Sequence, residues 1–188
     1  VAEVHARRLD SPMDSILKIT AANGKVLAFN DDHGDVGSGM NTHHADSYLM
    51  IELPEDGAYY VHLGDTTRNG GKAYAYRLRI SKPRPDFALR IVPAQAAFRS
   101  RGSAAVSVYA IRKEGFDGDI RLSLGDSMEG FTSSKVTLSK TKNKDVIRFG
   151  MRTQLRMTGE PVELTIEGHA NVGEQEITRT AVPSEDRM

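Results

Sequence analysis

The sequence of 188 residues contains no cysteine and no tryptophan. Without cysteine, the chain has no disulfide framework, no thiolate metal ligand and no cysteine nucleophile. It also has no excess charge of either sign, because 25 Lys and Arg residues balance 25 Asp and Glu residues. We therefore expect no nucleic acid partner and no attraction to an anionic membrane surface.

Long hydrophobic runs are absent as well. No apolar stretch approaches the roughly 20 residues that span a bilayer, so we expect no membrane insertion. No signal peptide is visible, and the sequence begins inside an apparent strand at residues 1–9. We expect the chain to be part of a larger polypeptide.

Helical periodicity is also missing, and short alternating segments take its place. Apolar and polar residues alternate with a period of two, which is typical of half-buried strands. In the first half this pattern predicts strands at residues 1–9, 15–20, 26–29, 47–53, 59–63 and 74–80. Asn23-Gly24 is a hairpin signal between two of them, because both turn residues need a positive φ.

Lys82-Pro83-Arg84-Pro85 interrupts the strand pattern and predicts a stiff linker. Beyond it, strands are expected at residues 87–92, 104–112, 120–124, 135–138, 145–151, 162–170 and 174–181. The predicted fold is all-β, with two tandem antiparallel β-sandwiches, the second a Greek key. The expected boundaries are a first domain at 1–82, a linker at 83–86, a second domain at 87–183 and a tail at 184–188.

An acidic loop follows the strand at residues 26–29. Calcium prefers carboxylate and amide oxygens, and such a site has the candidate ligands Asp14, Asn30, Asp31, Asp32, Asp35 and Asp46. The spacing is not that of an EF-hand, because no Glu stands at the twelfth position of the loop. The alternative is that these side chains form turns and cap backbone N–H groups.

The histidines and tyrosines each allow two interpretations, a binding site or an ordinary structural role. His33, His43 and His44 lie in the same loop and, with Asp46, have ligand types for zinc or nickel, although histidines in a polar loop are commonly solvated. Five tyrosines could form a face that binds sugars or peptides, or could pack in the sandwich with their hydroxyls at its rim. They are Tyr48, Tyr59, Tyr60, Tyr74 and Tyr76.

The remaining motifs do not suggest catalysis. No Gly-x-Ser-x-Gly elbow and no His-Glu-x-x-His helix is present. Arg77 and Arg79 form an outward basic row, for which Glu3 or Glu52 on a neighbouring strand would be a surface partner of little energetic value. We therefore expect that the protein is not an enzyme.

Residues 1–81 resemble the bacterial pre-peptidase C-terminal (PPC) domain. The resemblance rests on Ser11-Pro12-Met13-Asp14, Asn23-Gly24-Lys25, Asn30-Asp31-Asp32, Asp46-Ser47, Leu53-Pro54-Glu55-Asp56-Gly57-Ala58-Tyr59-Tyr60-Val61 and Tyr74-Ala75-Tyr76-Arg77-Leu78. It implies a jelly-roll-like sandwich, an extracytoplasmic location and a non-catalytic role. Residues 87–183 look like the immunoglobulin-like (Ig-like) domain that follows such modules in exported bacterial proteins. Related collagen-binding domains bind calcium, partly through an acidic segment before the first strand.

Together these observations predict a non-catalytic binding or spacer module of a larger exported protein, located outside the cytoplasm. The expected partner is an extracellular polymer or protein surface, and calcium is the expected cofactor. One alternative is an appendage that helps an attached hydrolase to mature or to be exported, with no ligand of its own. Another is a purely architectural segment.

Overall fold

A computed structural model describes residues 1–34, 46–125, 129–139 and 145–184. The chain forms two compact units, Val1–Pro83 and Arg84–Met188, which are treated separately below as unit 1 and unit 2. The described residues form strands and one short 3-10 turn, which confirms the all-β prediction. None of them builds a helix with the length and apolar character that a membrane crossing needs.

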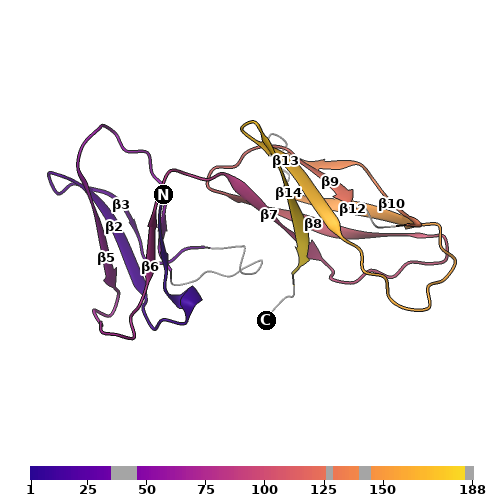
Figure 1. Ribbon diagram of the computed structural model, residues 1–188, viewed down its shortest axis with the longest axis horizontal. Helices are drawn as coiled ribbons and strands as arrows, with labels where there is room; N and C mark the ends of the chain where they lie inside the picture. The colour runs from indigo at the N-terminus through magenta and orange to yellow at the C-terminus, as the bar shows by residue number, and fades with distance from the viewer. Residues whose placement is uncertain (35–45, 126–128, 140–144, 185–188) are drawn as a thin grey trace. The chain divides into compact units, whose positions relative to one another are not determined.

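Unit 1 contains two three-stranded antiparallel sheets (Figure 1). One has the order β4-β1-β6 and the other β3-β2-β5. The elements are β1 (Ala2–His5), η1 (Arg7–Leu9), β2 (Ser15–Ala21), β3 (Val26–Asn30), β4 (Tyr48–Leu49), β5 (Tyr59–Asp65) and β6 (Arg77–Ile80). All six strands contribute to one apolar core, so the two sheets form a sandwich.

Alternation along β1 and β2 gives this core its pattern. Ala2 and Val4 of β1 are buried, and so are Leu17 and Ile19 of β2, as the period of two predicts. A turn forms at Asn23-Gly24 as predicted, but only Gly24 has the expected positive φ, at +82°, and its N–H donates to the Ala21 carbonyl over 2.9 Å. Its missing Cβ is what permits this left-handed conformation.

Three predicted strands of unit 1 are shorter in the structure than expected. The strand expected at 1–9 ends at His5, the strand at 47–53 is reduced to β4, and the strand at 74–80 begins at Arg77. After His5 the backbone N–H groups bond to a side chain instead of a neighbouring strand, and the chain turns into η1. Alternation in sequence did not reveal this change of partner.

Unit 2 is an eight-stranded arrangement with the order β10-β12-β8-β7-β14-β13-β9-β11 (Figure 1). Its strands are β7 (Asp86–Val92), β8 (Ser103–Lys113), β9 (Ile120–Leu124), β10 (Phe131–Ser133), β11 (Val136–Leu138), β12 (Val146–Thr153), β13 (Ile166–Val172) and β14 (Gln175–Pro183). The ends of this order approach each other, since β11 lies near β12 and β10 lies near β9. The layers enclose a core of their own around Phe87, Ile120 and Phe149.

Three features of unit 2 differ from the expectation. Strands β14 and β7 pair in parallel at Ala181 and Leu89, whereas every other strand pair described is antiparallel. Side chains alternate in the same way in parallel and antiparallel strands, so the alternation did not predict this parallel pair. Strand β10 was not predicted, and the strand expected at 162–170 begins only at Ile166.

Candidate functional site

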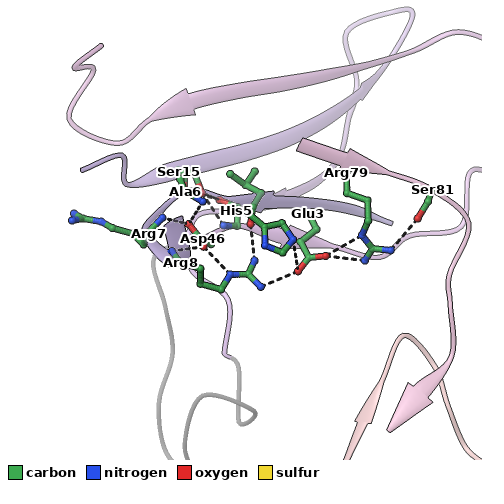
Figure 2. Close-up of polar contacts among 11 residues, drawn as sticks. Glu3, His5, Ala6, Arg7, Arg8, Ser15, Asp46, Arg79 and Ser81 are labelled. Carbon is green, nitrogen blue, oxygen red and sulfur yellow. Dashed lines mark hydrogen bonds and ion pairs between the residues drawn. The ribbon is translucent and has the colours of Figure 1, made fainter. Parts of the chain in front are cut away.

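Asp46, a predicted calcium ligand, lies at the centre of a buried polar network in unit 1. Its side chain has no exposed surface. Oδ1 accepts hydrogen bonds from the N–H groups of Ala6 (2.9 Å) and Arg7 (2.7 Å). Oδ2 accepts from the N–H (3.2 Å) and Nε (2.8 Å) of Arg8 (Figure 2). Both carboxylate oxygens are therefore already occupied by the turn that they hold.

These contacts set the charge state of Asp46. Burial alone raises the pKa of this carboxyl, because an apolar surrounding disfavours the charged form. The hydrogen bond from Arg8, together with the three backbone N–H donors, outweighs that effect and leaves the pKa below its ordinary value. Asp46 is thus held as a carboxylate without any metal.

Arg8 extends the network to the neighbouring sheet residues. Its Nη2 donates to the Val4 carbonyl (2.7 Å) and its Nη1 to Glu3 Oε1 (3.1 Å). Glu3 Oε2 in turn accepts from Nε (3.0 Å) and Nη2 (2.8 Å) of Arg79, and His5 Nε2 lies 3.3 Å from Oε1 (Figure 2). Arg79 therefore pairs with Glu3, which is one of the two partners expected from the sequence, Glu3 and Glu52.

The Glu3 carboxylate is less exposed to solvent than the surface ion pair expected from the sequence would be. Only 16% of its side chain is exposed. Burial raises the pKa of Glu3, but the hydrogen bonds from Arg79 and Arg8 lower it by more, so the net shift is downward. Two carboxylates and two guanidinium groups thus form one charge-balanced cluster that joins β1, η1 and β6.

Two serines connect the Asp46 segment to β2. Ser47 donates its N–H to Ser15 Oγ (2.8 Å) and its hydroxyl to the Ser15 carbonyl (2.6 Å). The two hydroxyl oxygens lie 2.9 Å apart, and both side chains are fully buried. The Ser47 carbonyl also accepts the N–H of Val4 over 2.9 Å. Asp46-Ser47 therefore fastens β1 and β2 together.

The other predicted calcium ligands make hydrogen bonds to different parts of unit 1 or are exposed. Asn30 Oδ1 accepts the Tyr48 N–H (2.9 Å), and its Nδ2 donates to the Asp32 carbonyl (2.8 Å), which joins β3 to β4. Asp14 Oδ2 accepts the Thr66 hydroxyl over 2.6 Å. Asp31 and Asp32 are exposed, and Asp35 lies outside the described residues.

Among the described residues, His, Asp and Glu side chains do not gather into a metal centre. Across residues 1–34, 46–125, 129–139 and 145–184, no three His, Asp or Glu side chains are grouped as metal ligands. The His33 ring packs on Tyr48 with centroids 4.6 Å apart. His43 and His44 fall outside the described residues. The turn-and-cap alternative accounts for the contacts of Asn30, Asp14 and Asp46, and the calcium and zinc sites stay predictions.

The five predicted tyrosines do not share one face. Tyr59 is half-buried and donates its hydroxyl to the Glu55 carbonyl (2.6 Å), whereas Tyr60, the next residue of β5, is 56% exposed. Tyr48 and Tyr74 are half-buried, and Tyr76 is exposed outside any strand. Of these residues, only Tyr60 stands on an open sheet surface.

That open surface is the side of the β3-β2-β5 sheet opposite the core. Lys18 pairs with Phe29 on one side and His62 on the other. Thr20 pairs with Val26 and Tyr60 in the same way, and partners directly across antiparallel strands project to the same side. We name the outer face as the side formed by Ile16, Lys18, Thr20, Val26, Phe29, Tyr60, His62 and Gly64.

Two rings and a polar row characterise the outer face. Phe29 is 54% exposed and Tyr60 is 56% exposed, on the two strands that flank β2. Between them, Thr20 Oγ1 and His62 Nε2 are 3.0 Å apart, which confirms that their side chains lie on one side. Gly64 leaves open space, because a Cβ built there meets no atom within 4 Å. The arrangement offers apolar rings and hydrogen-bonding groups on one side of a three-stranded sheet.

Sequence reasoning overlooked Phe29 and Arg8, although a signal existed for the first. A two-residue turn at Asn23-Gly24 predicts Lys18 opposite Phe29, and the structure has this pair after a register shift between Ile19 and Thr20. Because Leu17 points inward, Phe29 points outward. No comparable signal identifies Arg8. Its role depends on Asp46, which is 38 residues away in the chain.

No protein-family model matches the chain, and no curated protein matches it. Function must therefore be inferred from the side chains themselves. In unit 1, the buried Asp46 and the half-buried Glu3 use their carboxylates to hold strands together. The outer face carries exposed rings that the core does not use, and it is the candidate functional site.

Proposed function

We propose that the chain is a non-catalytic, extracytoplasmic binding module of a larger exported protein, and that the outer face of unit 1 binds an extracellular polysaccharide. The observation that carries the proposal is the pair of exposed rings, Phe29 and Tyr60, on an open three-stranded sheet. Exposed rings on two strands that flank a third suit an extended chain better than a compact small molecule.

The chemistry of the outer face agrees with a sugar chain. Aromatic rings present apolar faces that pack on the C–H faces of sugar rings, and the Tyr60 hydroxyl adds a hydrogen-bonding group. Lys18 and His62 supply further polar groups beside the rings, whereas Thr20 is buried and its hydroxyl pairs with His62. The eight residues include one lysine and no carboxylate, so the charge complements an acidic polysaccharide and does not repel a neutral one.

Unit 2 and the Pro-containing linker would act as a spacer for unit 1. Pro83 and Pro85 restrict the backbone between the two units. The proposed kinship of unit 1 with PPC domains is supported by the network around Asp46, because the motif residues Asp46, Ser47 and Asn30 all hold strands in place there. The proposed Ig-like character of unit 2 is supported by its sandwich of strands around one core.

Binding to insoluble polysaccharides tests this function. The full chain would be incubated with cellulose and with immobilised polygalacturonate, in buffer containing EDTA, and the bound fraction measured. We expect retention on the acidic polymer, and about thirtyfold weaker binding for Phe29→Ala/Tyr60→Ala, because each of the two lost rings contributes of the order of 1 kcal/mol.

A matched control is Tyr76→Ala. Tyr76 is 54% exposed, nearly the same as Tyr60, but it lies outside the outer face. This variant should bind as the unmodified chain does. Equal losses in Tyr76→Ala and the double variant, or no retention on either polymer, would contradict a polysaccharide role for the outer face. The second result would favour the appendage or the architectural alternative.

A further inference from the structure

Unit 2 contains a cavity of about 530 Å³ at one end of its sandwich. This volume is within the range of about 300–1,000 Å³ that is typical of small-molecule sites. Buried apolar side chains from five strands line its floor: Ile91, Val106, Met151, Ile166 and Ala181. Phe98 and Phe131, whose rings meet edge to face at 5.5 Å, line its wall.

The segments that border this cavity are fastened to the sandwich. The Arg101 N–H donates to the Leu155 carbonyl (2.9 Å), and the Thr153 N–H donates to the Gly102 carbonyl (2.9 Å). Gln154 donates to the Gly130 carbonyl over 2.9 Å. These hydrogen bonds join residues 153–155 to residues 101–102 and to Gly130. The cavity therefore exists before any ligand binds, which reduces the entropic cost of binding.

The cavity has a charged rim above its apolar floor. Arg99 and Arg156 contribute to the lining, and both are exposed. Glu163 contributes the one carboxylate among the lining residues. Within the described part of the chain, neither arginine has an ion pair or a side-chain hydrogen bond. Guanidinium groups bind carboxylates through paired N–H donors, so two of them against one glutamate favour an anionic group.

We propose that this cavity binds a small amphipathic carboxylate. The apolar chain or ring of the ligand lies on the floor around Val106 and Met151, and its carboxylate is held by Arg99 and Arg156. This site is separate from the outer face, because every lining residue belongs to unit 2. Its test therefore stands or fails independently of the polysaccharide proposal.

Three ligands separate the contributions of the two parts of the cavity. The full chain would be titrated by calorimetry and ligand-observed NMR with octanoate, octanol and acetate. Octanoate has both the apolar body and the carboxylate, whereas octanol lacks the charge and acetate lacks the body. We expect octanoate to bind about tenfold more tightly than octanol, and acetate not to bind, since a charge-assisted hydrogen bond contributes about 1.5–3 kcal/mol.

Variants at exposed positions assign the binding to the cavity. Arg99→Ala/Arg156→Ala should weaken octanoate to the level of octanol and leave octanol unchanged. Arg152→Ala removes an exposed arginine of β12 that is not in the lining, so it should change neither ligand. Ala94→Trp, at an exposed lining residue, should obstruct both.

Several results would overturn the proposal. Absence of octanoate binding at millimolar concentration would do so, as would equal affinity for octanol and octanoate. An unchanged affinity in the double arginine variant would remove the assigned role of Arg99 and Arg156. Undiminished binding in Ala94→Trp would place the ligand elsewhere on the molecule. A thermal melt of each variant confirms that it is folded before its affinity is compared.

Discussion

The Asp46 side chain occupies the position that a neighbouring strand would take beside residues 6–8. Its two oxygens accept four hydrogen bonds, three of them from consecutive backbone N–H groups. A carboxylate can supply these acceptors at one point, whereas a strand would supply them along a ladder. At the scale of the residue, an apparent metal ligand is therefore better explained as a cap that turns the chain out of β1.

Replacing Asp46 by alanine should destabilise unit 1 strongly. The Asp46→Ala change leaves the N–H groups of Ala6 and Arg7 and the Arg8 guanidinium without their acceptor in a buried site. Because 30% of the Arg8 side chain is exposed, most of the loss comes from the backbone donors left without an acceptor, and we expect about 1–3 kcal/mol. Chemical denaturation, followed by circular dichroism, measures the change in the free energy of unfolding.

Asp32→Ala is the matched control for this measurement. Asp32 belongs to the same acidic set, but its side chain is exposed. Its replacement should change the free energy of unfolding by no more than about 0.5 kcal/mol. Equal and small effects of both variants would show that the Asp46 contacts do not stabilise the fold.

Acidic pH should weaken unit 1 through Asp46 and Glu3. Folding lowers the pKa of both carboxyls below their ordinary values of 3.8 and 4.5. On acidification, the unfolded chain therefore takes up protons before the folded one does, and stability decreases. The contribution is complete above about pH 5 and is lost as the pH falls through the ordinary values towards the lower folded-state pKa. Thermal melts between about pH 7 and pH 3 measure the loss.

The neutral analogue identifies the titrating group. Asp46→Asn retains a carbonyl acceptor but cannot ionise, so its melting temperature should be lower at neutral pH and should decline less on acidification. The comparison between the two proteins is made at each pH, so effects of the other carboxyls cancel. A decline as steep as in the unmodified chain would exclude Asp46 as a source of the pH dependence.

At the scale of the element, the sequence was most informative where a strand alternates against one core. The inward positions Leu17 and Ile19 and the Asn23-Gly24 turn follow from local rules. The lengths of β1, β4 and β6 did not, because each depends on partners distant in the chain. The parallel pairing of β14 with β7 was missed for the same reason.

The candidate sites show the same division between local and distant information. The calcium prediction rested on residue type, whereas the hydrogen-bond partners of Asn30, Asp14 and Asp46 lie far from them in the chain. The outer face depends on register across three strands, which one hairpin signal specifies only in part. The cavity of unit 2 depends on segments from both ends of that unit, and no local pattern indicates it.

Gly168 of β13 tests how closely unit 2 is packed. A Cβ built at this glycine would lie 2.6 Å from Leu89 Cδ1 and 2.8 Å from Ile120 Cγ2. Gly168→Ala should therefore destabilise unit 2 by about 1–3 kcal/mol through overpacking. Gly150→Ala in β12 is the control, because its Cβ would have no neighbour closer than 3.5 Å. Similar stabilities of the two variants in denaturant would contradict close packing at Gly168.

At the scale of the whole molecule, removal of calcium should leave stability unchanged. A ligand that binds only the folded state raises the melting temperature by mass action. Both carboxylate oxygens of Asp46, Oδ2 of Asp14 and Oδ1 of Asn30 already accept protein hydrogen bonds, so we expect equal melts in millimolar calcium and in EDTA. A rise of several degrees in calcium that is lost in Asp31→Ala or Asp32→Ala would instead establish the acidic loop as a metal site.

The two units should unfold as separate cooperative bodies. The core around Leu17 and the core around Phe149 share no residue, and the chain divides between Pro83 and Arg84. A domain with its own core can fold alone. Residues 1–83 and 84–188, produced separately, should therefore each give a cooperative melt.

Variants within the full chain make this test independent of how the pieces behave in isolation. Asp46→Asn should lower only the transition of unit 1, and Gly168→Ala only that of unit 2, because each change acts on contacts within one core. Calorimetry of the two variants and the unmodified chain resolves the transitions. A single transition that both substitutions shift would mean that the two sandwiches stabilise each other. The linker would then connect parts of one cooperative body, and the spacer role proposed for unit 2 would lose its physical basis.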